Sequence, residues 1–245
     1  MGEVIAVLSG KGGTGKTSVC AGVATALADS GLEVLCIDCD MGLRNLDISL
    51  GITDLGCLSF TDVAEGNYSL EQAAVHPIYP KLRFLTAPVS TAADQVDTEA
   101  FKAMLKVARE SFDFVFLDAP AGIDLGFRLA AQYADRVLLV TGSDPAAVRD
   151  AARAGEILEL MGKREIRLIV NRINPKMVSA MDLTVDDVMD RAGLPLLGIV
   201  PEDPNVTLAA AFNKPLLKHT RRGAGSACRR IAKRICGRNV PVTLK

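Results

Sequence analysis

Short apolar runs alternate along the chain with longer segments of helical periodicity. The first run, EVIAVLSG at residues 3–10, is followed by a glycine-rich stretch and then by a helical pattern over residues 17–30. The apolar character of these runs is continuous rather than alternating, which is typical of strands covered on both faces of a sheet. Six further runs of this kind occur at residues 33–40, 82–88, 112–120, 135–142, 165–173 and 195–203.

The segments between the apolar runs have helical patterns, for example residues 146–161 and 184–191. Alternation of strands with helices implies βαβ crossovers and a mostly parallel sheet. The sequence has neither an internal repeat nor a linker rich in Ser, Pro and Gly. We therefore predict one α/β domain over residues 1–245, with a doubly wound and mostly parallel sheet.

Composition narrows the class of protein further. The chain has 245 residues, of which 49% are hydrophobic, and a formal net charge of −1. No apolar run approaches the roughly 20 residues that span a bilayer, and the N-terminus lacks the pattern of a secretory signal. These features predict a cytoplasmic protein, in which the six cysteines stay reduced.

The charge is unevenly distributed along the chain. The last acidic residue is Asp203, whereas ten Lys or Arg residues occur from Pro204 to Lys245. The first 203 residues therefore carry a net charge of −11 and the last 42 a net charge of +10. Such asymmetry indicates either an anionic partner or a solvated basic face.

The glycine-rich stretch after the first apolar run has the spacing of a phosphate-binding loop. Gly10, Gly15, Lys16 and Thr17 fit the pattern G-x-x-x-x-G-K-[ST], between a predicted strand and a predicted helix. Glycines let successive N–H groups turn inward, and the start of the helix adds partial positive charge. Lys16 then reaches the β- and γ-phosphates, and the Thr17 hydroxyl can bind Mg²⁺. The predicted nucleotide contacts here are Gly10, Lys11, Gly12, Gly13, Thr14, Gly15, Lys16, Thr17 and Ser18.

The same loop contains a second lysine, Lys11, that the motif does not require. A second cation on phosphate oxygens would stabilise the charge of the transition state, as an arginine finger does. The stretch KGGTGKT at residues 11–17 resembles the deviant Walker A motif of the MinD/ParA family of P-loop ATPases. In that family the early lysine crosses a dimer interface, so the resemblance implies a homodimer with ATP between the two copies and a catalytic role for Lys11.

Three carboxylates follow apolar runs that we predict to lie beside this loop. Asp38 and Asp40 end the second run and, being two residues apart, point the same way from an extended chain. Asp118 ends the fourth run in the Walker B pattern, and Gly122 follows it. The family resemblance implies that Asp40 positions the attacking water and that the Gly122 N–H senses the γ-phosphate. The implied catalytic residues are Lys11, Lys16 and Asp40, and the implied Mg²⁺ residues are Thr17, Asp38 and Asp118.

Recognition of the base is expected from the last two apolar runs. The segments VNRINP and PEDP resemble family segments that contact adenine. A side-chain amide can both donate to adenine and accept from its amino group. The Asp of the NKxD-type motif found in GTP-binding relatives is absent, which favours ATP. The candidate residues are Asn171, Arg172, Pro201, Glu202 and Asp203.

Similarity to the MinD/ParA family extends from Glu3 to about Val242. The segments DMGLRNLD, DAPAGID, MDLTVDDVMDRAGLPLLGIVPED and RRIAKRICGRNVPV resemble the division-site-selection branch more than the DNA-segregation branch. That branch implies ATP-dependent dimers, a position at the inner membrane surface, and two partners, a division inhibitor of MinC type and a topological regulator of MinE or DivIVA type. Many members continue into a membrane-targeting helix where this sequence stops, so we expect dimer-enhanced, electrostatic membrane association without an inserted anchor.

The segment at about residues 225–237 has the pattern of a basic amphipathic helix. Small apolar residues and cysteines, Cys236 included, recur at helical spacing, and four Lys or Arg residues occupy the opposite face. Such small residues insert weakly into a bilayer. We therefore expect the helix to pack on the domain with its basic face outward, where it can contact anionic lipid electrostatically.

Other functions fit part of the same pattern. A DNA-segregation ATPase or a flagellar-number positioning ATPase would share the loop and differ in its partner, although DNA is the less favoured partner. The spacing Cys36-x2-Cys39 could suggest an iron–sulfur scaffold, but a pair along a strand is better interpreted as small buried hydrophobes. A nucleotide-binding module without catalysis is disfavoured by Asp40 and the two lysines.

Overall fold

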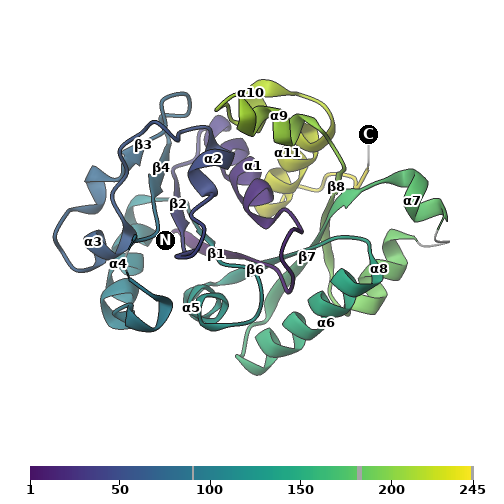
Figure 1. Cartoon of the computed structure of the whole chain (residues 1–245), viewed down its shortest axis with the longest axis horizontal. Coiled ribbons are helices and arrows are strands. Elements are labelled where there is room, and N and C mark those ends of the chain that lie inside the picture. Colours follow the sequence, from purple (N-terminus) through teal and green to yellow (C-terminus); the bar gives the residue numbers. More distant parts are fainter. Residues whose placement is uncertain (90, 181–183, 244–245) are drawn as a thin grey trace.

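An eight-stranded sheet lies at the centre of this computed structural model, which describes residues 1–89, 91–180 and 184–243 (Figure 1). Residues 181–183, in one of the segments that carry the family resemblance, and 244–245 lie outside the described residues. The strand order is β3-β4-β2-β5-β1-β6-β7-β8, and every neighbouring pair is parallel except β3 with β4. The strands are β1 (Glu3–Leu8), β2 (Val34–Asp38), β3 (Ala74–Val75), β4 (Leu82–Leu85), β5 (Phe114–Asp118), β6 (Arg136–Thr141), β7 (Glu165–Ile173) and β8 (Leu196–Pro201).

This architecture confirms the predicted single α/β domain with a mostly parallel, doubly wound sheet. Each of the seven apolar runs contains one of the parallel strands. The antiparallel strand β3 was not predicted, because it has only two residues and neither is fully buried.

Helices cover both faces of the sheet, as Figure 1 shows. In β1, Ile5 and Val7 pack into one core, whereas Val4, Ala6 and Leu8 pack into the other. The first core also contains residues of α1 (Lys16–Asp29), α2 (Leu46–Leu50), α9 (Asn205–Ala211), α10 (Leu216–His219) and α11 (Gly223–Ile235). The second contains residues of α3 (Phe60–Ala64), α4 (Thr98–Ser111), α5 (Leu125–Tyr133), α6 (Pro145–Leu160) and α8 (Val185–Ala192), while α7 (Pro175–Ala180) follows β7.

The basic helix α11 packs against α1 and β8. Cys228 on α11 faces Gly22 on α1, where a side-chain carbon on the glycine would lie only 2.6 Å from the Cys228 sulfur. Gly22 therefore allows the two helices to approach closely. Cys236 follows the helix and is exposed, so its predicted place on the apolar face is wrong.

Two basic side chains of α11, Arg234 and Arg229, contact other parts of the domain. The Arg234 guanidinium donates to the backbone carbonyls of Leu197, at 2.7 Å, and Val240. Arg229 forms an ion pair with Asp29 at 3.2 Å. The expected outward basic face is therefore wrong for Arg234, which is committed to β8 and to the segment after the helix.

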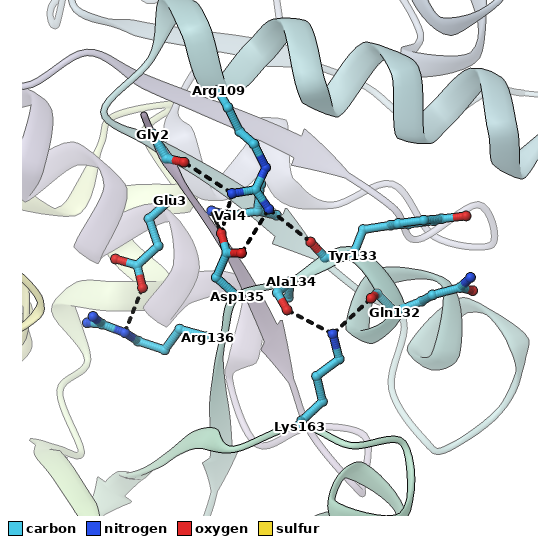
Figure 2. A network of polar contacts seen from close by, with 10 residues as sticks. All are labelled: Gly2, Glu3, Val4, Arg109, Gln132, Tyr133, Ala134, Asp135, Arg136 and Lys163. Atoms are coloured by element: carbon cyan, nitrogen blue, oxygen red, sulfur yellow. Dashed lines mark hydrogen bonds and ion pairs between the residues drawn. The ribbon is translucent and has the colours of Figure 1, made fainter.

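Polar bonds hold the edge of the sheet where β1 begins (Figure 2). Asp135 accepts from the Val4 amide at 2.8 Å and pairs with Arg109, which also donates to the Gly2 carbonyl. Lys163 donates to the carbonyls of Gln132 and Ala134, both at 2.8 Å. This network joins α4, β1 and the turn before β6. It lies at the opposite edge of the sheet from Asp38 and Asp118, which end β2 and β5.

Candidate functional site

The glycine-rich loop leaves β1 at the carboxyl edge of the sheet and leads directly into α1. Gly13 and Gly15 adopt φ angles of 79° and 82°, in the left-handed region that favours glycine. A side-chain carbon on Gly15 would also lie 2.3 Å from the Asn171 amide nitrogen. The loop therefore needs glycine at position 15 for its backbone conformation and for its packing against β7.

Lys16 makes a buried ion pair with Asp118 at the end of β5. The distance from Nζ to Oδ1 is 2.7 Å, and the two side chains are 6% and 1% exposed. Lys16 Nζ also donates to the Thr17 hydroxyl at 3.3 Å. Burial raises the pKa of Asp118, and the neighbouring ammonium of Lys16 opposes that rise. The predicted phosphate-binding lysine and the predicted metal carboxylate thus lie in direct contact.

Asp38 lies beside Asp118 because the two residues are register partners on the paired strands β2 and β5. Its oxygens accept from the amides of Asp40, at 2.9 Å, and Leu46, at 3.1 Å. Burial, followed by the charge of Asp118, raises the pKa of Asp38 to about 7. Two buried carboxylates side by side repel each other, and a divalent cation between them would relieve that repulsion.

The residues at this edge fit Mg²⁺. The Thr17 hydroxyl and the carboxylates of Asp38 and Asp118 are hard oxygen donors of the kind that Mg²⁺ prefers. In the part of the chain that the structure describes, no group of three or more Asp, Glu, His or Cys residues could hold a metal ion. Mg²⁺ bound here would therefore need further oxygens from a nucleotide or from water.

Asp40 lies on the loop that follows β2. Its Oδ1 accepts from the amides of Gly42 and Leu43, both at 3.1 Å, so the carboxylate also shapes this turn. It lines a cavity of about 490 Å³ that reaches Pro120 on the loop after β5. Gly122 on that loop has a φ of 97°, and its amide donates to the carbonyl of Ser9 at 3.1 Å. The loop expected to position the attacking water and the loop expected to sense the γ-phosphate thus lie against each other.

Lys11 lies apart from the contact between Lys16 and Asp118. Its ammonium pairs with Asp144 at 3.6 Å, and the two side chains are 46% and 55% exposed. Asp144 also begins α6 by accepting from the Ala147 amide at 3.0 Å. Asp144 was not predicted from the sequence, although Asp before Pro at the start of a helical pattern is a recognisable helix start.

The predicted base-recognition residues surround a cavity of about 540 Å³ next to the loop. Asn171 is buried and donates to the Thr14 carbonyl at 2.7 Å, which ties β7 to the loop. Asp203 accepts from the amides of Asn205 and Ala224, so its carboxylate organises the wall of this cavity. Seven of the predicted nucleotide contacts line this cavity, namely Gly15, Ser18, Asn171, Arg172, Pro201, Glu202 and Asp203.

The C-terminal helices contribute cavity residues that were not predicted from the sequence. They include Thr207 on α9, Leu216 on α10, and Ala224 and Cys228 on α11. Of these four residues, only Cys228 belongs to the predicted apolar face of the C-terminal helix, and that pattern by itself indicates packing on the domain rather than a cavity.

Two buried hydroxyl groups lie at the two ends of the loop, Ser9 after β1 and Thr14 just before Gly15. The hydroxyl oxygens of Ser9 and Thr14 have no hydrogen-bond partner among the described residues. Buried polar atoms in native structures nearly always have a partner. Their position beside the glycines is consistent with a polar ligand in this loop.

A glycine loop between a buried strand and a helix, with a lysine on the carboxylate that ends a neighbouring strand, defines a nucleotide-binding P-loop protein. Residues 5–216 match the model of the CobQ/CobB/MinD/ParA nucleotide binding domain, and the chain belongs to this family. It is 36% identical to the septum site-determining protein MinD of Synechocystis sp. over 244 residues, which cover 98% of this chain and 92% of that protein. Members of the MinD/ParA group are nucleotide-binding ATPases.

Solved structures show the same relationship. The MinC:MinD cell division protein complex of Aquifex aeolicus matches with a TM-score of 0.91 and 35% identity, over 98% of both chains. MinD of Pyrococcus horikoshii, complexed with Mg-ADP, matches with a TM-score of 0.83 and 29% identity, over 96% of both chains. A ParA family ATPase from Chlorobium tepidum, at 21% identity and a TM-score of 0.81, shares the fold. The chain is thus a MinD-like member of the family.

Proposed function

We propose that the protein is a Mg²⁺-dependent ATPase that dimerises when ATP is bound and acts as a switch in placing the division site. The observation that carries the proposal is the pair of lysines in one loop. Lys16 is buried and forms an ion pair with Asp118. Lys11 is half-exposed and forms a surface ion pair with Asp144. An exposed ion pair contributes only about 0–1 kcal/mol, so Lys11 can leave Asp144 for a stronger anion on a second copy of the chain.

The proposed chemistry assigns each residue a separate task. The N–H groups of the loop and Lys16 would bind the β- and γ-phosphates. Thr17, Asp38 and Asp118 would hold Mg²⁺, which when bound would supply positive charge to the phosphate oxygens. Asp40 orients a water molecule for attack on the γ-phosphate. Lys11 of the partner subunit adds a second cation where negative charge develops.

The cavity beside the loop supports adenine recognition. Asn171 and the turn at residues 201–203 line it, together with Arg172 and the apolar wall from α10 and α11. Bound there, adenine would stack against apolar side chains while polar groups select it. We propose ATP as the nucleotide.

Partners follow from the relatives. MinD is in complex with MinC in the Aquifex aeolicus structure. We propose a division inhibitor of the MinC type as a partner of this chain, and a topological regulator of the MinE or DivIVA type as a second partner.

Deletion of the gene in its host tests the cellular role. We expect septa near the poles and small cells without DNA, with normal positioning restored by the wild-type gene and not by Asp40→Ala. Anucleate cells of normal size with central septa would instead support DNA segregation. Normal septa with an altered number of flagella would support flagellar positioning.

Membrane contact is the part of the proposal that concerns localisation. In the described part of the chain, no helix is long and apolar enough to cross a bilayer. We propose a cytoplasmic protein that makes electrostatic contact with anionic lipid through its C-terminal segment, where ten basic and no acidic residues follow Asp203. Co-sedimentation with anionic vesicles is expected to rise with ATP and to vanish at high salt. Salt-resistant binding to neutral vesicles would contradict the electrostatic mechanism.

Asp144 offers a test of how Lys11 is held. Asp144→Asn removes the negative charge and keeps an oxygen for the Ala147 amide, so α6 should remain capped. We expect half-maximal dimerisation at about two- to threefold less ATP, because an exposed ion pair contributes less than about 1 kcal/mol. Light scattering across an ATP titration measures the ATP concentration for half-maximal dimerisation. Asp144→Ala loses both the charge and the cap, so its difference from Asp144→Asn gives the effect of losing the cap. An Asp144→Asn protein that needs more ATP than the wild type would contradict this arrangement.

A further inference from the structure

His76, in the connection between β3 and β4, is buried and makes three hydrogen bonds through its ring. Its Nδ1 accepts from the backbone amides of Ile78, at 3.0 Å, and Tyr79, at 3.2 Å. A ring nitrogen that accepts from two amides carries no proton, so the proton of the neutral ring lies on Nε2. Nε2 is 3.0 Å from the carbonyl of Leu50 and therefore donates to it.

The Leu50 carbonyl belongs to the last residue of α2, and the other end of α2 reaches the candidate metal site. The Leu46 amide, at the first residue of this helix, donates to Asp38 Oδ2 at 3.1 Å. Leu46 and Leu50 are both fully buried in the core beside α1. At five residues, α2 spans less than two turns, so we expect a shift at its Leu50 end to reach its Leu46 end.

We propose that His76 is a positioning residue for Asp38. Its Nε2–H fixes the C-terminal end of α2, and α2 in turn holds the Leu46 amide on the Asp38 carboxylate. Among the described residues, the amides of Leu46 and Asp40 are the two hydrogen-bond donors to Asp38, so a shift of α2 frees one of its two oxygens. The consequence for Mg²⁺ rests on the proposed function, whereas the link from His76 to Leu46 does not.

Two substitutions separate this role from a local role in the turn. In His76→Asn the side-chain oxygen replaces Nδ1 and can accept from the amides at 78 and 79, as in an Asx-turn, but nothing reaches Leu50. In His76→Gln the longer side chain places an N–H donor near the position of Nε2 and restores the bond to Leu50. His76→Asn therefore keeps the turn and releases α2, whereas His76→Gln keeps α2 in place.

Hydrogen exchange of the Leu46 amide, followed by NMR on protein without nucleotide or Mg²⁺, tests the link directly. We expect exchange about fivefold faster in His76→Asn, the equilibrium factor that one hydrogen bond supplies, and near wild type in His76→Gln. Amides of β1 and β5 should exchange as in the wild type in both variants. In ATPase assays, the Mg²⁺ concentration for half-maximal rate should rise about fivefold in His76→Asn.

The outcomes distinguish this inference from the proposed function. Unchanged Leu46 exchange in His76→Asn would overturn the positioning role, as would His76→Gln behaving like His76→Asn. Faster exchange of β1 and β5 amides in His76→Asn would also overturn it, because the residue would then stabilise the whole fold. A wild-type protein without Mg²⁺-dependent ATPase activity would contradict the proposed function, and the Leu46 measurement would still decide the role of His76.

Discussion

Replacing Lys16 by Ala is expected to abolish the binding of Mg-ATP. The β- and γ-phosphates would lose their direct counter-ion, and each charge-assisted hydrogen bond contributes about 1.5–3 kcal/mol, so two of them correspond to a loss of affinity on the order of a hundredfold or more. Titration with a fluorescent ATP analogue measures the affinity, and Lys106→Ala, at an exposed lysine on α4, is the matched control. Unchanged affinity in Lys16→Ala would mean that the loop does not bind phosphate.

The buried ion pair complicates this experiment in a way that can be controlled. Lys16→Ala leaves Asp118, which is 1% exposed, without its cation. Removing one partner of a buried pair typically costs about 3–5 kcal/mol of stability. The double variant Lys16→Ala/Asp118→Asn removes the uncompensated charge, so we expect it to melt at a higher temperature than Lys16→Ala and still to bind no ATP. Recovery of ATP binding in the double variant would show that the loss in Lys16→Ala came from misfolding.

Replacing Asp40 is expected to slow hydrolysis while leaving ATP binding nearly intact. Loss of a group that positions or deprotonates the attacking water lowers the rate by a factor of about 10²–10⁴. The structure adds a second role, because Asp40 also accepts from the amides of Gly42 and Leu43. Asp40→Asn retains an acceptor for these amides and loses the charge, whereas Asp40→Ala loses both.

The two Asp40 variants therefore separate chemistry from loop structure. We expect kcat to fall by at least about a hundredfold in both, with ATP affinity within about threefold of the wild type for Asp40→Asn. Phosphate release under saturating ATP gives kcat, and a nucleotide titration gives the affinity. Normal turnover in Asp40→Asn would assign Asp40 to the loop alone and make Asp38 the next candidate for orienting water.

The sequence predicted the parts of the fold and site that depend on local pattern. The seven parallel strands are continuous apolar runs because both of their faces are buried, and the ends of these runs place Asp38 and Asp118 side by side in register. The spacing of the motif predicted Gly15 as a loop residue. The structure gives the reason that glycine is needed there, since its left-handed φ and its contact with Asn171 both exclude a side chain.

The remaining features depend on contacts between distant segments, which leave no local pattern. Asp144 meets Lys11 across 133 positions of the sequence. Cys228 lines the cavity of about 540 Å³ beside the loop because α11 packs against α1. His76 lies 26 positions from Leu50 and is an isolated histidine in the sequence. Arg234 was expected at the surface by periodicity, yet two backbone carbonyls bind its guanidinium.

Light scattering in the presence of ATP tests most directly whether two copies of this chain close around the nucleotide through Lys11. The Asp40→Asn background slows hydrolysis during the measurement and retains the acceptor for the Gly42 and Leu43 amides. With ADP we expect the 26.0 kDa mass of the single chain, and with ATP twice that mass. With Lys11→Ala added, we expect the mass to stay at that of one chain although ATP still binds. A full dimer of the Lys11→Ala protein would contradict the role of Lys11. An equal mass with ADP and with ATP in the protein that retains Lys11 would contradict ATP-dependent dimerisation.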